Sequence, residues 1–570
     1  MSGAVTVARR LGMRVRAVLP DHATWSTMRR SPRKDLLAGL TVAIVALPLA
    51  LGFGVASGAG AQAGLATAVV AGALAAVFGG SNFQVSGPTG AMTVVLVPIV
   101  HRYGTDGVLT VGLLAGLLLV ATALGGAGRF MAFVPAPVVE GFTLGIAAVI
   151  GLQQVPAALG VQASGAENTA VAAWDALADF VADPHPTALA LAAGVAAVML
   201  LGARLRPGVP FSLLAVVGAT LLASGAGLDV ATIGHLPSGL PAPSLGFFHV
   251  ADVPKLATAA VAVAALAALE SLMSATAADA MSVSERHDSD RELFGQGLAN
   301  LAAPLFGGVA ATGAIARTAV NVRSGAASRL AALVHAAVLA IVVLLAAPLV
   351  EGIPLAALAG VLIATAVRMV EVASLRALAR AGRGEAAILT LTAATTLAFD
   401  LVTAVVVGLL VAGALALRQV ARSAALTRVP LHDGLPPADH HTEEQALLAE
   451  HIVAYRIDGP LFFAAAHRFL LELAETGDVK ALVLRLSRIT AIDATGALVL
   501  GDAIDKLEHR GVLVLVSGVR EDHRRTLDAL GTLDRLHAEH RVFATTPDAI
   551  AHARTHLGVH LTPAAGGGGR

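Results

Sequence analysis

One acidic residue interrupts a long apolar run of this 570-residue chain. Glu270 lies in the run 257–278, whose other residues carry no charge. Because a carboxylate is costly in an apolar environment, such a group usually faces water or a partner. Glu270 is therefore a candidate for carrying a proton. The alternative is a structural hydrogen bond to a neighbouring helix. Ser271 and Ser274 add hydroxyl groups to the same run.

A basic residue, Arg317, follows a second unusual segment. Residues 307–317 run from Gly-Gly through Thr-Gly into a short apolar helix. Arg317 could attract anions or pair with Glu270. The alternative is a snorkelling side chain or a purely structural ion pair.

A similar break lies at residues 84–92. Its Ser-Gly-Pro-Thr stretch predicts an extended approach and a helix start at Pro88. Free N–H groups and the helix dipole at two such starts would suit an anion. Matched breaks in the two halves of a membrane domain also indicate an inverted repeat with a central site. The alternative is a pair of tight re-entrant turns that bind no ligand.

The elements that must position these residues are membrane helices. The chain is 56% hydrophobic and 14% charged, whereas soluble domains carry about 25% charged residues. Runs long enough to cross a bilayer begin near residues 36, 64, 108, 135, 188, 212, 257, 330, 355, 386 and 401. Three shorter segments, 84–100, 293–309 and 312–323, bring the predicted number of spans to about 14.

The charges predict the orientation. Basic residues precede the first run, lie between predicted spans twelve and thirteen, and follow the last span, so all three places are expected to be cytoplasmic. They are Arg9, Arg10, Arg14, Arg16, Arg29, Arg30, Arg33 and Lys34, then Arg368, Arg376, Arg380 and Arg383, then Arg418, Arg422 and Arg428. The N-terminus does not have the pattern of a cleavable signal. Both termini are thus predicted to be cytoplasmic.

Composition divides the chain near residue 425. We expect a basic N-terminus (1–34), a transmembrane domain (35–425), a linker (426–446), a soluble domain (447–558) and a disordered tail (559–570). In the soluble part we expect strands at 451–457, 461–463, 480–486 and 512–517, with a turn at 458–460. Helices are expected at 464–475, 495–510 and 520–529. This alternation predicts a small α/β layer with a mainly parallel sheet.

Several motifs together resemble the SulP (sulfate permease) family of anion transporters over nearly the whole chain. They are Asp35–Val42 with Ala46–Ala50, Gly79–Ser81 with Val85–Ala91, Glu140–Gly145, Gln153-Gln154, Gly295–Asn300, and Ala316–Gly325. This order and spacing are specific to the family, although each motif alone would be a weak signal.

The resemblance implies two inverted repeats of seven spans, a core and a gate domain, a homodimer, and an elevator-like movement. Carried over from the family, the substrate-binding residues are Ala46, Leu47, Phe53, Thr89, Gly90, Ala91, Gly313, Ala314, Ile315 and Arg317. Glu270 matches an acidic position associated with cation coupling, with Ser274 beside it. Sodium-coupled bicarbonate members often have Asp there, so Glu favours protons over sodium.

The soluble part resembles the STAS domain that follows SulP membrane domains. The resemblance rests on Ile492–Gly496, which open its second helix. In related anti-sigma-factor antagonists this position holds a phosphorylatable serine, so Thr495 is a candidate phosphorylation site. Helix capping is the commoner explanation for such a residue. A cytoplasmic regulator of this domain is a further expected partner.

The predicted function is secondary transport of a small anion across a bacterial-type plasma membrane. Sulfate, a C4-dicarboxylate and bicarbonate are the candidate substrates, with proton-coupled symport favoured. The alternatives are an anion channel or exchanger, sodium-coupled bicarbonate uptake, and a sensor that signals through the soluble domain. With no cysteine, no Walker-type phosphate loop and no metal-ligand cluster, no cofactor, ATP-driven transport or enzyme is predicted. The 39 basic and 39 acidic residues do not suggest a nucleic-acid partner.

Overall fold

The computed structural model describes residues 18–20, 22–128, 135–162, 166, 168–184, 186–206, 209–282, 286–399, 401–423, 425–428, 451–461 and 479–558. Several predictions lie outside these ranges. They concern Arg9, Arg10, Arg14, Arg16, the linker around 431–445, the helix at 464–475 and the tail 559–570. The chain forms two compact units, Met1–Leu410 and Val411–Arg570, so the division falls inside the last membrane-type helix. The domain limits drawn from composition stay a prediction.

The first unit is built almost entirely from helices. Its longer helices are α3 (Pro32–Ala56), α4 (Ala61–Phe78), α5 (Gly90–Gly125), α6 (Ala136–Gln153), α9 (Pro186–Leu205), α10 (Phe211–Gly225), α11 (Val253–Met281), α12 (Ser289–Ala302), α14 (Leu330–Leu345), α16 (Leu355–Met369) and α18 (Arg383–Ala398), and α19 (Leu401–Ser423) leads into the second unit. The shorter ones are α2 (His22–Met28), α7 (Val155–Leu159), α8 (Thr169–Ala182), η2 (Val250–Asp252), η3 (Ala303–Phe306), α13 (Ile315–Arg323), α15 (Ala347–Glu351) and α17 (Val372–Ala381).

The helices begin close to where the apolar runs predict them. Among the described residues, seven helices are long and apolar enough to cross a membrane, and three shorter apolar helices accompany them. α5 contains a break at Gly104, whose φ of 67° and ψ of −172° are not helical. This break accounts for the separate predictions at 84–100 and from residue 108. The total of 14 spans stays a prediction.

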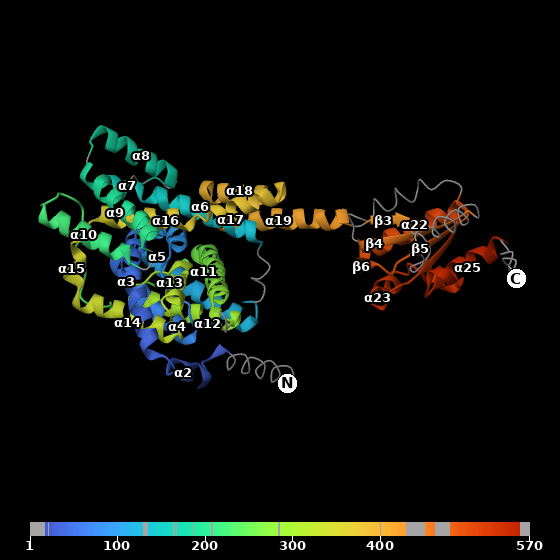
Figure 1. Ribbon diagram of the computed structural model, residues 1–570, viewed down its shortest axis with the longest axis horizontal. Coiled ribbons are helices and arrows are strands. Elements are labelled where there is room, and N and C mark those ends of the chain that lie inside the picture. The colour runs from blue at the N-terminus through green and yellow to red at the C-terminus, as the bar shows by residue number, and fades with distance from the viewer. Residues whose placement is uncertain are drawn as a thin grey trace, which may run out of the picture. The chain divides into compact units, whose positions relative to one another are not determined.

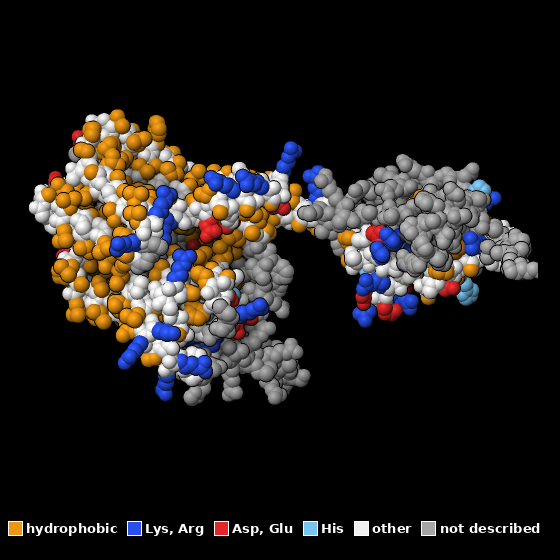
Figure 2. Space-filling model, in the orientation of Figure 1, with side chains coloured by type: hydrophobic (Ala, Val, Ile, Leu, Met, Phe, Trp, Pro, Cys, Tyr) orange, Lys and Arg blue, Asp and Glu red, His pale blue; other side chains and the backbone are white. Residues whose placement is uncertain are grey.

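The surface of the first unit is apolar. Hydrophobic side chains cover much of its visible face in Figure 2. Large exposed apolar residues include Leu205, Leu221, Leu345 and Phe399, each more than half exposed. Exposed apolar surface of this extent is typical of helices that face lipid rather than water.

Two very short strands pair with each other within the helical unit. β1 (Ser86–Gly87) pairs antiparallel with β2 (Thr312–Gly313), so that Ser86 lies opposite Gly313 and Gly87 opposite Thr312. α5 follows β1 and α13 follows β2. α11 packs against both of these helices, and α12 packs against α4 and α5 (Figure 1). The two breaks seen in the sequence therefore meet at one place.

The second unit is an α/β domain. Its sheet has the order β3 (Ala425–Arg428), β4 (Ile452–Leu461), β5 (Ala481–Arg485), β7 (Leu513–Ser517), β8 (Val542–Phe543), and β6 (Ile489–Ile492) also pairs with β4. All pairs are parallel except β3 with β4. Alternating residues of the strands form two cores, one with α22 (Ala494–His509) and α23 (Glu521–Ala529), the other with α25 (Thr546–His556). A short α24 (Asp534–Ala538) precedes β8.

The predicted sheet is confirmed as mainly parallel, and one prediction within it is wrong. Residues 458–460 do not form a turn between two strands, because β4 continues through them. Gly459, with a φ of 90°, pairs with Ile489 of β6, and the register of the two strands shifts between Gly459 and Leu461. A glycine with positive φ and a proline without an N–H group have the composition of a turn, but here they lie inside β4 where its register with β6 shifts.

Candidate functional site

The paired strands bring two helix starts together. Ala314 N donates to Val85 O at 3.0 Å and extends the pairing of β1 with β2 by one residue. α5 begins directly after Thr89, whose hydroxyl accepts from Met92 N at 3.4 Å, and α13 begins directly after Ala314. The first-turn N–H groups of a helix have no earlier carbonyl within that helix to bind. Two sets of such donors therefore start beside the same strand pair.

Glu270 on α11 joins the two broken segments. Its Oε2 accepts hydrogen bonds from Thr89 Oγ1 at 2.8 Å and from Thr312 Oγ1 at 2.7 Å. One threonine precedes α5 and the other lies in β2, so the same carboxylate oxygen holds a hydroxyl from each segment. Hydrogen bonds to an ionised group are about twice as strong as those between neutral groups.

The serines of α11 contact the second broken segment. Ser271 Oγ accepts from Gly313 N at 3.0 Å, and Ser274 Oγ lies 3.0 Å from Thr318 Oγ1. Thr318 Oγ1 in turn accepts from Val85 N at 3.1 Å. Ser271 thus contacts the β2 backbone, whereas Ser274 contacts Thr318, which binds the residue before β1.

Arg317 is buried beside the paired strands β1 and β2. Its Nη2 donates to Pro88 O at 2.8 Å, while its Nη1 is buried without a hydrogen-bond partner. The described contacts of Arg317 and Glu270 include no direct ion pair between the two side chains. A Cβ on Gly87 would lie 2.6 Å from Arg317 Nη1, so only glycine leaves room for the guanidinium. An unpartnered cationic N–H beside two helix starts is a donor that an anion could use.

The other predicted binding residues near the pair of β1 and β2 differ in how far their side chains are exposed. Phe53 of α3 packs against Gly90, where an added Cβ would lie 3.2 Å from the Phe53 ring. Ala46 and Ala91 are buried, Leu47 and Ala314 are half-buried, and the Ile315 side chain is 43% exposed. The structure thus brings Phe53, Thr89, Gly90, Glu270 and Arg317 to the two helix starts.

Some residues at the site were missed from the sequence. Thr312 was not among the predicted binding residues, although the Thr-Gly pair at 312–313 repeats the pair at 89–90. Ser271 was noted only as a neighbour of Glu270. The repeated Thr-Gly pair was the signal in the sequence that could have identified Thr312.

Residues 279–292, which follow the apolar run of Glu270, form a cluster rich in charge. This composition predicts a solvated surface, and the prediction is wrong for Glu292. Its side chain is 1% exposed and binds the loop before β1. The start of α12 places Glu292 beside the amides of Gly80 and Ser81, which replace water as its hydrogen-bond donors. Glu285 lies outside the described residues.

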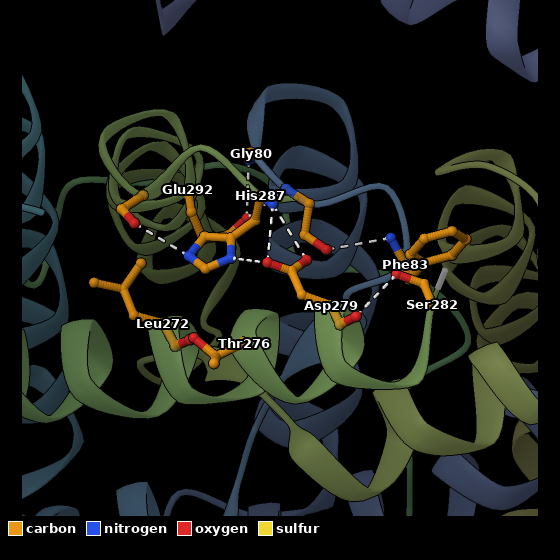
Figure 3. Close-up of polar contacts among 10 residues, drawn as sticks. Gly80, Phe83, Leu272, Thr276, Asp279, Ser282, His287 and Glu292 are labelled. Carbon is orange, nitrogen blue, oxygen red and sulfur yellow. Dashed lines mark hydrogen bonds and ion pairs between the residues drawn. The ribbon is translucent and has the colours of Figure 1, made fainter. Parts of the chain in front are cut away.

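Asp279 and His287 of the same cluster form a pair at the end of α11. His287 Nδ1 lies 2.7 Å from Asp279 Oδ2, and the His287 backbone N–H also donates to this carboxylate (Figure 3). Ser289 Oγ lies 3.1 Å from the other ring nitrogen of His287. The pair connects the end of α11 to the start of α12.

Thr495 lies in the second unit at the start of α22. Its side chain is exposed, and the helix is capped by Asp493, whose Oδ1 accepts from Gly496 N at 2.6 Å. Capping therefore does not explain Thr495. Its phosphorylation stays a prediction.

Known families match both parts of the chain. The Sulfate permease family profile matches residues 33–392, and the STAS domain profile matches residues 445–549. "Putative sulfate transporter YvdB" of Bacillus subtilis (strain 168) is 35% identical over 520 residues, covering 89% of this chain and 95% of the relative. "Bicarbonate transporter BicA" of Picosynechococcus sp. is 31% identical over 524 residues, covering 89% and 92%.

Solved structures show the same fold. The transmembrane domain of a cyanobacterial bicarbonate transporter, BicA, matches with a TM-score of 0.61 and 32% identity over 66% of this chain and 98% of that domain. SLC26A9 matches with a TM-score of 0.80 over 97% of this chain and 94% of its own, at 16% identity, and so supports the fold alone.

Proposed function

The chain belongs to the sulfate permease family, and from this premise we propose that it is a secondary active transporter of a small anion. The observation that carries the proposal is the meeting of two helix starts, the unpartnered Nη1 of Arg317 and the carboxylate of Glu270 at one strand pair. The helix starts and Arg317 supply N–H donors for an anion. Glu270 supplies a group whose charge can change during the cycle.

The charges in this arrangement support proton-coupled symport. An ionised Glu270 repels an anion that approaches the same strand pair. Protonation removes this negative charge and weakens its hold on the hydroxyls of Thr89 and Thr312. Binding of the proton and of the anion would then favour each other. We further propose that the site moves across the membrane by an elevator-like shift of the core helices.

The substrate proposed is sulfate or a C4-dicarboxylate, followed by bicarbonate. Helix N-termini bind all these anions through backbone N–H groups, so the donors favour the class over any one member. Two relatives at 31% identity are named bicarbonate transporters, which favours a second candidate, sodium-coupled bicarbonate uptake. The oxygens of Glu270, Thr89 and Thr312 are ligands of the type that a hard cation takes.

The proposal includes the setting of the protein. We place the membrane part in a bacterial-type plasma membrane with both chain ends in the cytoplasm, as the arginines around α17 and those at the end of and after α19 indicate. A homodimer and a cytoplasmic regulator of the STAS domain complete the proposed partners. The exposed Thr495 at the start of α22 is the proposed phosphorylation position.

Uptake into proteoliposomes tests the function. Labelled sulfate, bicarbonate, succinate and fumarate are offered under imposed proton gradients, imposed sodium gradients, or neither. We expect saturable uptake of one or more of these anions that rises with an inward proton gradient. Ohmic conductance without saturation would indicate a channel, and substrate binding by purified protein without uptake would indicate a sensor. Uptake driven by sodium alone would favour the second candidate.

A further inference from the structure

One face of α12 carries three buried polar residues, Glu292, Gln296 and Asn300. Their side chains are 1%, 0% and 0% exposed, respectively. Residues four apart lie above one another on one face of a helix, so the three form a continuous row. This row is called the polar stripe of α12. Burying such groups is costly unless each is hydrogen-bonded, so their partners indicate what the stripe does.

Glu292 binds the segment that leads into β1. Its Oε2 accepts from Gly80 N at 2.9 Å and from Ser81 N at 3.1 Å. Its Oε1 accepts from Gln84 Nε2 at 2.8 Å and from Gln296 Nε2 at 2.9 Å. All four contacts are donors to the carboxylate, and three of them come from the segment 80–84 that leads into β1.

Gln296 and Asn300 bind the two segments that contain β1 and β2. Gln296 Nε2 also donates to Ser86 Oγ in β1 at 2.6 Å. Asn300 Oδ1 accepts from Ala311 N at 2.8 Å, and Asn300 Nδ2 donates to Ala311 O at 2.9 Å. Ala311 directly precedes β2, and Asn300 engages both of its backbone groups as a neighbouring strand would.

β1 and β2 need such support. Each has two residues, and a short two-stranded ribbon is not stable alone. The stripe contacts the first segment at Ser86, which is followed by Gly87, Pro88 and Thr89. It contacts the second segment at Ala311, next to Thr312. Thr312 directly follows Ala311, and Thr89 follows Ser86 by three residues, so the stripe helps to fix the positions of the two threonines that hold Glu270.

We propose that the polar stripe of α12 is a positioning element of the transport site. It holds the segments that contain β1 and β2 from the α12 side, so that Thr89 and Thr312 both reach Glu270. The two helix starts then face the same anion. This inference rests on the proposed function. The described hydrogen bonds of the stripe residues do not include one to Glu270 or Arg317, so their effect is transmitted through the strands.

The test compares two equivalent changes of carboxylate to amide. In Glu292→Gln, the new amide group cannot accept hydrogen bonds from two of the four donors. Asp35→Asn is the matched control, because Asp35 is also fully buried and accepts from Ala327 N, Ser328 N and Ser328 Oγ, away from the strand pair. Asn300→Asp is the second variant. It keeps the acceptor for Ala311 N and loses the two bonds that Asn300 Nδ2 donates, to Ala311 O at 2.9 Å and to Gln296 O at 2.8 Å.

The readouts are the KM and maximal rate of anion uptake per folded protein, and the anion concentration that half-maximally protects the purified protein from heat. We expect Glu292→Gln and Asn300→Asp to raise the KM and this concentration about tenfold, the effect of losing one buried hydrogen bond. Asp35→Asn should lower the thermal midpoint and leave the KM unchanged. If Glu292→Gln does not fold, Asn300→Asp decides.

Two failures can be told apart. Wild-type KM in the folded stripe variants would overturn the inference while the wild type still transports. A wild-type protein that neither transports nor is protected by any of the anions would overturn the proposed function itself.

Discussion

At the scale of the residue, one oxygen atom of Glu270 is shared by the two halves of the candidate site. Thr89 and Thr312 both donate to Oε2, and each comes from a different broken segment. Any change in the charge of this carboxylate therefore reaches both segments at once. This arrangement gives a physical route by which protonation of Glu270 would affect the proposed anion site.

The residue-scale account predicts that the two hydroxyls are equivalent. Thr312→Val and Thr89→Val each remove one hydrogen bond to Glu270 and keep the side-chain size. We expect either variant to lower proton-driven uptake about tenfold or more, because a hydrogen bond to a charged group contributes about 1.5–3 kcal/mol. The measurement is initial uptake in proteoliposomes with an imposed proton gradient.

Thr276→Val is the control for this pair. Thr276 also lies on α11, but its hydroxyl bonds Leu272 O of its own helix. It should transport like the wild type. An effect of Thr312→Val no larger than that of Thr276→Val would contradict the role of the shared oxygen.

The sequence indicated these residues only in part. Glu270 and Arg317 could be singled out because a charge in an apolar run is conspicuous. Thr312 and the stripe residues Glu292, Gln296 and Asn300 were missed as functional residues, because their importance lies in partners far away in the chain. The spacing 292, 296, 300 was visible in the sequence, but nothing there indicated whether water or a strand would bind that face.

At the scale of the element, the two broken helices define the site. Their Gly, Pro and Thr residues predicted both breaks, and the structure has strands followed by helix starts at both places. The pairing of β1 with β2 could not be predicted, because each strand has two residues and the partners come from opposite halves of the membrane domain. In the second unit, β3 and β6 were missed because a strand of four residues gives only a short pattern in the sequence.

The fit between β1 and α13 gives a prediction for Gly87. In Gly87→Ala the new Cβ would lie 2.6 Å from Arg317 Nη1, and the φ of 154° is one that residues with side chains rarely adopt. We expect the guanidinium to leave Pro88 O, uptake to fall severalfold, and the protein to lose roughly 1–3 kcal/mol of stability. Uptake assays and thermal unfolding in detergent measure the two effects.

Gly125→Ala on α5 is the matched control, since its added Cβ would have no heavy atom within 4 Å. It should match the wild type in both measurements. Normal uptake by Gly87→Ala would mean that the contact between β1 and Arg317 is not needed for transport.

At the scale of the whole molecule, the chain joins a helical membrane unit to an α/β domain, and each matches its own known family. The hydrophobic cores of the two units are separate. Composition alone separated the two parts, because an apolar surface and a charged surface require different residues. The number of spans and the limits of the domains remain predictions.

Separate cores predict that the membrane unit folds without the STAS domain. We expect a chain lacking residues 431–570 to keep its thermal midpoint in detergent but to change in transport rate or dimer formation. Truncation after Ser423 is the control, because it also removes β3, which pairs with β4 of the sheet. Wild-type flux and wild-type dimer formation in both truncations would make the domain dispensable for transport.

The most direct test of the central claim is uptake by Glu270→Gln compared with the wild type. Both are reconstituted in proteoliposomes, and uptake of the anion that the wild type carries is measured with an inward proton gradient and, separately, as exchange without a gradient. The variant keeps the side-chain shape and removes the group that can change charge. The account predicts that gradient-driven uptake is lost while some exchange remains. Proton-dependent uptake unchanged from the wild type would contradict it.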